Sequence, residues 1–420
     1  MKPMLFVLGT LVVAASVFAA ERPALDVRDF GAKGDGTTKD TAAIQKALDT
    51  CAAAGGGSVL VSNGTFLTGS LVIGANTTLE IAAPASLAGS ADIADYPLVN
   101  IRWEGEFREG HRALISALNA ANITVAGGGA IIGPDAALSR LRNPRGPVLI
   151  ELTGCTNAVL ENFTTQYQNL WSIHPLFCKN FTARGLTIRS VGANGDGIDV
   201  DSCDGVTIGH CDINTGDDAI SLKSGRGLAA QNLARPTENV VIRDCQLHSS
   251  IYAALGLGTE MSGGIRNVKL ENCVVSGKQN AIFIKSRGGR GGFMENISGE
   301  NLTVLKSPTF IGIDLLSKGI QATDPVPGDV DQWPRVQDIS FKNVRVQDIA
   351  TLVAGKNVPA GRPVDGFALA DISGTCAHGI ALANMTNVKL SGIRVTGFAG
   401  PLISTENVKG TGLALSAALK

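Results

Sequence analysis

Five segments of the chain repeat one short pattern of polar and apolar residues. Each begins with a polar residue or glycine, continues with alternating apolar and polar positions, and ends in a second short apolar run. Neighbouring copies in the middle of the chain begin about 28 to 34 residues apart. Alternation with a period of two predicts short β-strands, separated here by Asn, Gly, Asp and Ser turns. The copies begin at Asn157, Gly205, Asn239, Asn267 and Asp338.

A unit of this size cannot bury its own apolar face, so successive copies have to stack as the coils of a solenoid. Cys211, Cys245 and Cys273 share one register in three copies, and Phe163 takes that place in an earlier copy, so we expect these side chains to stack inside. Sandwiches need hairpins and Greek-key connections, and a doubly wound sheet needs alternating helices. The pattern therefore predicts an all-β fold, a single-stranded right-handed parallel β-helix.

One helix is predicted, between Asp40 and Ala54. Asp40 can cap its N-terminus, and residues 55–57 are three glycines that end it. Its apolar face is expected to plug the first coil, because an open solenoid end would be an edge for aggregation. The stretch after Thr375 is expected to form further coils. The apolar face of the helix consists of Ile44, Ala47, Leu48 and Cys51.

The amino-terminal residues 1–19 have the features of a cleavable signal peptide. A lysine precedes an apolar run that ends in Val17-Phe18-Ala19, a small-x-small cleavage pattern. The run is shorter than the about 20 residues that a membrane span needs, which makes an anchor the weaker interpretation. We therefore expect a secreted or periplasmic protein whose residues 20–420 form a single β-helix domain.

Composition agrees with one unit built of short strands. The chain has 51 glycines in 420 residues and only 5% aromatic residues, and no linker or charge block interrupts it. The formal net charge of −1 gives no overall field to attract nucleic acid or an anionic membrane. Eight cysteines could pair after export but are not needed as staples in a chain this long. We expect a monomer that binds neither nucleic acid nor membrane.

An acidic cluster occupies two neighbouring copies. Asp196 and Asp217 are 21 residues apart, about one short coil, so stacking would place Asp196 beside the Asp217-Asp218 pair. Carboxylates that close raise at least one pKa and provide a protonated acid beside an ionised base. Glycoside hydrolysis needs this pair, although clustered carboxylates also suit Ca²⁺. The nearby Asp199, Asp201 and Asp204 are interpreted as ordinary turn residues.

Basic side chains lie near the predicted acidic face. Lys285 ends the equivalent strand two coils after the acids and could bind a substrate carboxylate, although a solvated strand-end lysine has the same pattern. Lys223, at the end of the strand after Asp218, is a weaker candidate of the same kind. Arg287 and Arg290, in a Gly-rich turn, are expected to be solvated.

Trp171 and His174 come one coil before the acids. They could border the cleft and contact sugar, and core or turn packing is the alternative. The Gly-rich stretches lack the strand–turn–helix context that nucleotide binding requires, so no cofactor is expected.

At these residues the chain resembles glycoside hydrolase family 28, the polygalacturonase family. The resemblance implies hydrolysis of galacturonan, rhamnogalacturonan or a related pectic chain, with inversion and without a metal. It further implies that Asp217 is the general acid, that Asp196 and Asp218 hold and deprotonate water, and that Lys285 contacts a substrate carboxylate. The motifs follow in family order: DVRDFGAKGDGTTKDTAAIQKALD, NLWSIHP, NGDGIDVDSC, GDDAISLKSG, RPTENVVIRDC, GLGTEMSGGIRNV and FIKSRGGRGG.

The chain departs from the family pattern at three positions. Gly195 stands where the family has Thr before the first acid. Ala253 replaces the histidine of a Gly-His-Gly motif, and Phe283 replaces the arginine of Arg-Ile-Lys. Losing a guanidinium removes a bidentate partner for galacturonate, so a rhamnose-containing or substituted pectic chain competes with plain homogalacturonan as the substrate.

Two other classes of function remain as alternatives. A pectate-lyase-like eliminase would need Ca²⁺ and an arginine base near the acids, whereas here three acids stand in hydrolase order. A non-catalytic glycan-binding β-helix or adhesin is the second alternative, but a binding scaffold has no reason to keep like charges in contact.

Overall fold

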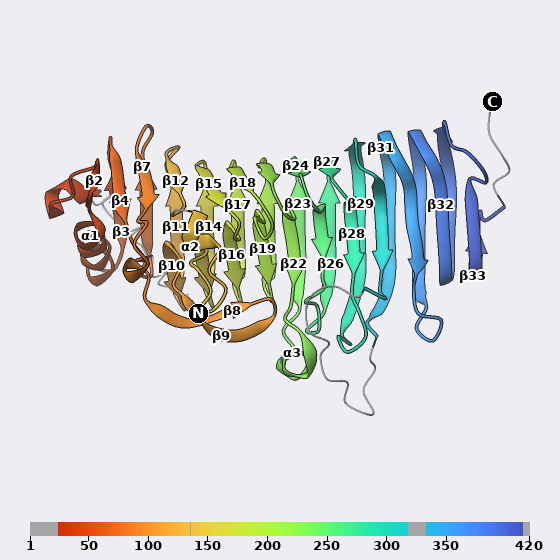
Figure 1. The fold of residues 1–420 in the computed structure, drawn as a ribbon, viewed down its shortest axis with the longest axis horizontal. Coiled ribbons are helices and arrows are strands. Elements are labelled where there is room, and N and C mark those ends of the chain that lie inside the picture. The colour runs from red at the N-terminus through yellow and green to blue at the C-terminus, as the bar shows by residue number, and fades with distance from the viewer. Residues whose placement is uncertain (1–23, 135, 318–332, 415–420) are drawn as a thin grey trace, which may run out of the picture.

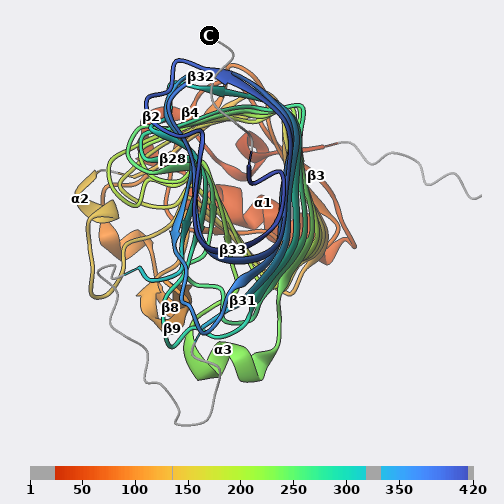
Figure 2. The same ribbon diagram turned by 90° about the vertical axis from the view of Figure 1, so that its right-hand side faces the viewer.

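The computed structural model describes residues 24–134, 136–317 and 333–414 (Figure 1). Over these residues the chain is a parallel β-helix, in which 31 strands form one continuous sheet wound into the tube that Figure 2 shows end on. The expected fold class is confirmed. The expected signal peptide lies outside the described residues, and the division into one domain stays a prediction. No helix in the described part of the chain is long and apolar enough to cross a membrane.

The strands stack in three ladders, one for each side of the coil. The first ladder is β1 (Leu25–Asp26), β3 (Gly57–Val61), β6 (Thr77–Ile81), β11 (Ala121–Ala126), β14 (Thr156–Glu161), β17 (Lys179–Arg184), β20 (Asp204–Gly209), β23 (Thr237–Arg243) and β26 (Ile265–Glu271). The second is β2 (Asp35–Lys39), β4 (Thr65–Thr68), β7 (Ser86–Gly89), β12 (Ala130–Ile132), β15 (Thr164–Gln168), β18 (Thr187–Val191), β21 (Asp212–Thr215), β24 (Gln246–Ser249) and β27 (Val274–Gly277).

The third ladder carries the candidate site. It is β5 (Leu71–Val72), β10 (Ile115–Leu118), β13 (Ile150–Thr153), β16 (Ile173–Leu176), β19 (Ile198–Asp201), β22 (Ile220–Lys223), β25 (Ala253–Leu257), β28 (Asn280–Lys285) and β30 (Thr309–Asp314). Towards the C-terminus the strands lengthen and run through the corners as β29 (Phe293–Leu305), β31 (Arg335–Asn357), β32 (Val364–Thr396) and β33 (Ile403–Thr411). The stretch after Thr375 thus forms further coils, as expected.

Asparagines turn the chain at one corner of the coil. They adopt a left-handed backbone, with φ of 54° to 58°, which asparagine tolerates better than other side-chain-bearing residues. Five of the side-chain amides donate to the amide oxygen of the asparagine one coil earlier, over 2.8 to 3.0 Å, and the amide of Asn239 donates to the carboxylate of Asp204 at 2.7 Å. The asparagines therefore fix the register between coils. They are Asn76, Asn122, Asn157 and Asn180, followed after Asp204 by Asn239, Asn267 and Asn296.

The interior is an aliphatic core in which equivalent side chains stack. The expected column is present: backbone register places Phe163, Leu186, Cys211, Cys245, Cys273 and Leu302 one above another, all buried. A second buried column, Cys155, Cys178 and Cys203, was not anticipated. All eight cysteines are free thiols.

A helix closes the N-terminal end of the tube, as predicted. Helix α1 (Thr41–Ala53) buries the predicted apolar face against the first coils, and Figure 2 shows it across the bore. The expected side-chain cap is wrong, because the Asp40 carboxylate instead accepts from Lys33 N at 2.7 Å and Gly34 N at 2.9 Å. It therefore stabilises the preceding loop, not the first turn of the helix.

One antiparallel hairpin stands outside the solenoid. Strands β8 (Leu98–Trp103) and β9 (Glu106–His111) follow β7 and run alongside the third ladder as far as β19 (Figure 1). Trp103 stacks on Trp171 with ring centroids 4.1 Å apart, which holds the hairpin against the tube. The remaining short helices are η1 (Val27–Phe30), η2 (Ile93–Asp95), α2 (Ala136–Ser139) and α3 (Gly227–Leu233).

Candidate active site

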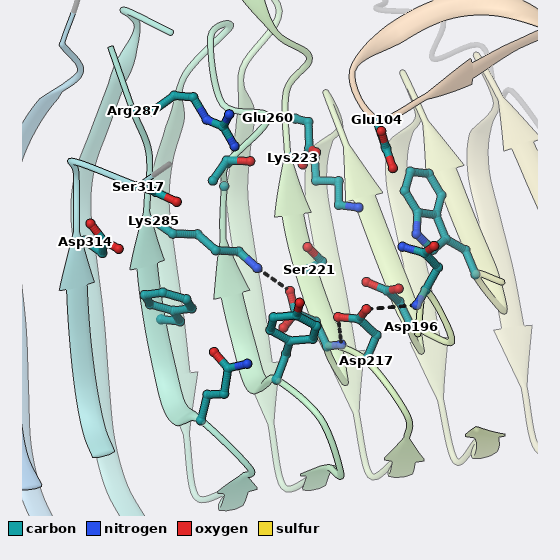
Figure 3. A pocket seen from close by; sticks show the side chains of 18 residues that line it. Glu104, Asp196, Asp217, Ser221, Lys223, Glu260, Lys285, Arg287, Asp314 and Ser317 are labelled. Atoms are coloured by element: carbon teal, nitrogen blue, oxygen red, sulfur yellow. Dashed lines mark hydrogen bonds and ion pairs between the residues drawn. The ribbon is translucent and has the colours of Figure 1, made fainter. Parts of the chain in front are cut away.

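Three aspartates meet at the start of two neighbouring strands of the third ladder. Ile198 of β19 pairs with Ile220 of β22, and Gly197 N donates to Asp218 O at 3.0 Å. This register sets Asp196 beside Asp217 and Asp218, as the sequence spacing predicts. Each of the three carboxylates offers an oxygen within 4.8 Å of the other two. Asp196 and Asp217 lie side by side in Figure 3.

Backbone and lysine hydrogen bonds orient two of the carboxylates. Asp217 accepts from Asn194 N and from Asp218 N, both at 2.9 Å. Asp218 accepts from Ala253 N at 3.0 Å and from Lys285 Nζ at 2.9 Å. The family histidine is thus replaced by an alanine whose side chain contributes nothing, while its backbone N–H still holds an acid.

Asp196 is held differently. Its side chain is buried, and its Oδ1 has no hydrogen-bond partner among the described residues. A buried polar atom without a partner is costly unless water or a ligand satisfies it. Since Asp196 lines the cavity described below, that partner can come from the cavity.

The cluster changes the protonation of its members. Burial and the charges of Asp199 and Asp217 raise the pKa of Asp196 well above its ordinary value. Burial and the charge of Asp218 likewise raise the pKa of Asp217. Burial disfavours the charge of Lys285, but the carboxylates of Asp218, Asp217 and Glu260 together outweigh burial and raise the lysine pKa to about 12. The site therefore retains a proton on its carboxylates at a pH where an isolated aspartate has lost it.

A glycine in the next coil makes room for the acids. Gly256 lies opposite Ser221 in the ladder, and a Cβ built on it would stand 2.4 Å from Asp218 Oδ2. No side chain larger than hydrogen fits there without moving the carboxylate. Phe283 occupies the next place in the same row.

The acids line a cavity of about 380 Å³ on the outer face of the third ladder. Among the described residues its walls carry six carboxylates and three cationic side chains. Lys223 pairs with Asp199 at 2.7 Å, and Lys285 pairs with Asp218. The positive charges of these two lysines are thus balanced by protein carboxylates before an anionic ligand arrives. The charged wall residues are Glu104, Asp196, Asp217, Asp218, Glu260, Asp314, Lys223, Lys285 and Arg287.

Lys223 and Trp171 lie together at the hairpin side of this cavity. The Lys223 ammonium is 3.7 Å from the centre of the Trp171 ring, and both side chains line the cavity. Burial opposes the charge of Lys223, but Asp199 and Glu260 raise its pKa. The structure therefore places both of these candidate substrate-binding residues at the cavity.

The interpretation of Asp199 and Asp201 as turn residues is wrong. Both are fully buried on β19, where Asp199 pairs with Lys223 and Asp201 lies 3.4 Å from Arg102 Nε of the hairpin. Burial raises the pKa of Asp199 to about 6, against the opposing charge of Lys223. Burial also opposes the charge of Asp201, but Arg102 and His174 lower its pKa.

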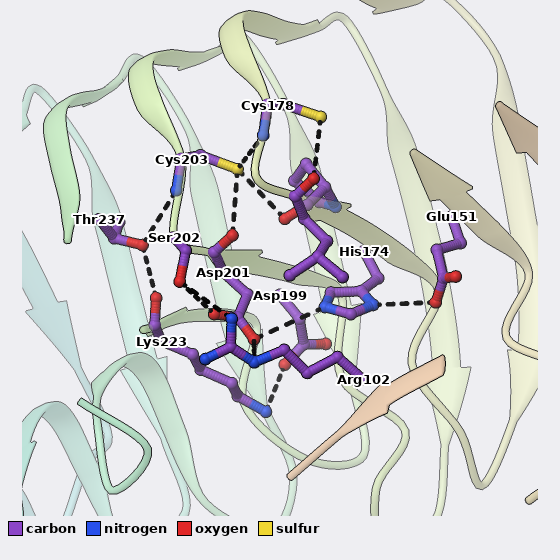
Figure 4. Close-up of polar contacts among 12 residues, drawn as sticks. Arg102, Glu151, His174, Cys178, Asp199, Asp201, Ser202, Cys203, Lys223 and Thr237 are labelled. Carbon is purple, nitrogen blue, oxygen red and sulfur yellow. Dashed lines mark hydrogen bonds and ion pairs between the residues drawn. The ribbon is translucent and has the colours of Figure 1, made fainter. Parts of the chain in front are cut away.

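His174 belongs to this buried network and does not line the cavity (Figure 4). Its Nδ1 is 3.1 Å from Glu151 Oε2 and its Nε2 is 3.9 Å from Asp201 Oδ2. Burial disfavours its charge, but the two carboxylates outweigh burial and raise its pKa to about 9. The Trp171 ring packs edge-on against it at 4.9 Å. His174 thus supports the cavity wall from behind, which matches the packing alternative.

The expectation that Arg287 and Arg290 are solvated is wrong. Arg287 is 5% exposed and lines the cavity, and Arg290 is fully buried. Sequence reasoning also missed Glu104 of the hairpin turn and Glu260, both in the cavity wall. Glu260 lies within the recognised run GLGTEMSGGIRNV, which was the signal that could have found it. Glu104 lies in a segment without any repeat and gave no signal.

Comparisons with known proteins agree with this geometry. The sequence profile described as "Glycosyl hydrolases family 28" matches residues 51–392. A "Probable polygalacturonase" of Vitis vinifera is 29% identical over 364 residues, which cover 82% of this chain and 73% of that protein. An "Endo-polygalacturonase" of Pectobacterium carotovorum subsp. carotovorum is 28% identical over 365 residues, 79% of this chain and 83% of that protein. The crystal structure of a hyperthermoactive exopolygalacturonase from Thermotoga maritima superposes with a TM-score of 0.74 and 25% identity, covering 88% of this chain and 92% of the other.

Proposed function

This chain is a glycosidase that belongs to glycosyl hydrolases family 28, and we propose that it cleaves a pectic chain with Asp217 as general acid and Asp196 and Asp218 as the residues that activate water. The observation that carries the proposal is the meeting of the three carboxylates within 4.8 Å in the wall of a cavity. Glycoside hydrolysis needs a protonated and an ionised carboxyl on either side of the scissile bond.

The chemistry follows from the contacts of each acid. Asp217, whose pKa is raised, gives its proton to the glycosidic oxygen as the bond from that oxygen to the anomeric carbon breaks. A water molecule attacks the anomeric carbon and loses a proton to whichever of Asp196 and Asp218 is ionised beside it. Asp196 Oδ1 supports the water because it has no other hydrogen-bond partner among the described residues. Lys285 neutralises Asp218 and so allows three carboxylates to share the site.

Inversion is part of the proposal and rests on the family resemblance. The separation of the acids points the other way, because inverting enzymes usually hold their two carboxyl groups about 6.5 to 9.5 Å apart and retaining enzymes about 5 Å. Here the nearest oxygens lie within 4.8 Å. Following the anomer released first by proton NMR decides between the two, and retention of configuration would overturn the inverting mechanism.

The roles of the acids can be separated with leaving groups. Asp217→Asn should abolish cleavage of natural pectic chains, but should retain activity on an aryl glycoside whose leaving group needs no proton. Asp196→Asn and Asp218→Asn should lose both activities. Asp204→Asn is the matched control, because Asp204 begins the next strand, β20, and lies outside the cavity. If Asp217→Asn cleaves natural chains at the wild-type rate, the assignment of the acid is wrong.

The substrate is proposed from the charges of the cavity. Its many carboxylates, two paired cations and Phe283 favour a sugar with less charge than galacturonate beside the acids. Rhamnogalacturonan or esterified oligosaccharides should therefore be cleaved faster than free homogalacturonan. The assay follows reducing ends and ultraviolet absorbance in EDTA. An unsaturated, absorbing product would indicate an eliminase, and loss of activity in EDTA would contradict a reaction that needs no metal.

Export and a monomeric state are also proposed. The support for export is the apolar amino-terminal run that ends in Val17-Phe18-Ala19. Expressed as the full chain in a bacterial host, the protein should accumulate outside the cytoplasm with a new terminus near Ala20, which N-terminal sequencing detects. Size-exclusion chromatography with light scattering tests the monomer, and an unprocessed terminus would contradict the signal peptide.

A further inference from the structure

A second cavity continues the first one towards the C-terminus. It measures about 310 Å³ and lies over β28, β30, β31 and Ala381 of β32. Phe283 and Asp314 line both cavities, so the two are adjoining parts of one cleft along the third ladder. A polysaccharide bound at the acids would extend along such a cleft.

The central row of the second cavity carries three small residues after Phe283. Phe283, Gly312, Ala354 and Ala381 follow one another in register across four coils. A Cβ on Gly312 would stand 2.3 Å from Asn280 Oδ1 and 3.2 Å from Phe283 Cδ2, so the Phe283 ring lies against this glycine. An aromatic ring beside a row of small residues suits the apolar face of a sugar ring.

Lys356 stands at the rim of this second cavity. Its side chain is exposed, and its ammonium group makes no ion pair or hydrogen bond with any other residue in the described ranges. Lys223 and Lys285 of the first cavity, by contrast, are both committed to buried carboxylates. Lys356 is therefore available to a carboxylate that arrives with the ligand.

We propose that Lys356, Thr351 and Phe283 form a distal subsite that binds a uronate unit of the substrate chain. This subsite rests on the proposed function, since it places part of the same pectic chain. The four strand spacings between β22 and β31 amount to about 19 Å at about 4.8 Å each, so the subsite holds a sugar roughly four units from the acids. The catalytic cavity then receives the less charged sugar and the distal subsite the charged one.

The test compares Lys356→Gln with wild type on homogalacturonan and rhamnogalacturonan oligosaccharides of two to eight units, each with free and with methyl-esterified carboxyls. On long free-acid oligosaccharides the variant should raise KM about threefold to fivefold with kcat unchanged, the small factor expected of an exposed ion pair. Added salt should remove the difference. Lys356→Arg should restore the wild-type KM. Lys389→Gln, an exposed lysine of β32 away from both cavities, is the control.

The outcomes separate the subsite from the function it rests on. Equal KM values for Lys356→Gln and wild type on long free-acid chains would overturn the subsite alone. An effect of the same size on disaccharides or on esterified chains would also overturn it, because neither presents a carboxylate to Lys356. If wild type cleaves no oligosaccharide of the panel, the proposed function fails and the subsite falls with it. Thermal unfolding of each variant confirms that folding is intact.

Discussion

Replacing Gly256 by alanine should disable the enzyme without unfolding it. The added Cβ would stand 2.4 Å from Asp218 Oδ2 and 2.9 Å from Asp218 Cγ. The backbone φ of Gly256 lies outside the left-handed region, so alanine fits the backbone and only the carboxylate has to give way. Moving it breaks its hydrogen bond with Ala253 N or with Lys285 Nζ.

The size of the loss follows from the displacement. The carboxylate must retreat by about 1 Å to reach an ordinary contact distance, and a misplacement of about 1 Å in a catalytic group can cost about 100-fold in rate. This corresponds to about 2.7 kcal/mol of transition-state stabilisation. Since the change moves one reacting carboxylate and leaves the other wall residues in place, we expect the loss in kcat and little change in KM.

Gly312→Ala is the matched control. Gly312 lies two coils further in the same row, and its added Cβ would stand 2.3 Å from another side-chain oxygen, Asn280 Oδ1, far from the acids. Both variants carry a similar steric cost, so their urea midpoints should fall together. Gly312 belongs to the floor of the second cavity, so its variant can change KM, while only Gly256→Ala loses kcat. Gly256→Ala with kcat within threefold of Gly312→Ala would show that the position of Asp218 does not limit the reaction.

Four further outcomes are expected. Since Asp217 acts as an acid with a raised pKa, kcat should fall as the pH rises through that pKa. Lys285 lowers the pKa of Asp217, so Lys285→Met should move this limb of the pH profile to higher pH. The pKa of His174 is about 9 in the folded protein and 6.5 in the unfolded chain, so its charge contributes stability on the order of 3 kcal/mol. This contribution is complete below about pH 6.5 and is lost as the pH rises through 9. The free energies of unfolding of wild type and His174→Asn in urea should therefore converge above pH 9. Arg102→Met leaves a buried carboxylate with one partner fewer and should cost about 3 kcal/mol in chemical denaturation, whereas an unchanged midpoint would show that the ion pair is neutral. Asn267→Ala should cost about 2 kcal/mol, because alanine is strained at a φ of 55° and two hydrogen bonds disappear; Asn267→Gly, free of the strain, should cost about half as much.

The sequence predicts whatever repeats from coil to coil. Alternation and turn residues indicate the solenoid, and the spacing between Asp196 and Asp217 places the acids side by side because a coil has a nearly fixed length. The column of Cys211, Cys245 and Cys273 follows from the same register. Helix α1 was predictable because its apolar period differs from that of the strands.

Features that depend on contacts between non-repeating segments were beyond the sequence. Asp201 looks like a turn residue until the hairpin brings Arg102 against it, 201 − 102 = 99 residues away in the chain. Arg287 looks solvated because its neighbours are glycines, but the fold buries it in the cavity wall. His174 gave no signal of whether it faces the cleft or the core, since both faces of β16 are buried.

The cysteine columns have a practical consequence. All eight thiols are reduced and buried, so the fold of the described residues does not depend on disulfide formation, and the chain without residues 1–19 should fold in a reducing cytosol as well as in an oxidising compartment. Buried thiols react with alkylating reagents only when the coils open. Each thiol therefore reports local opening of its own coil, and mass spectrometry of alkylated peptides would show in which order the solenoid unwinds.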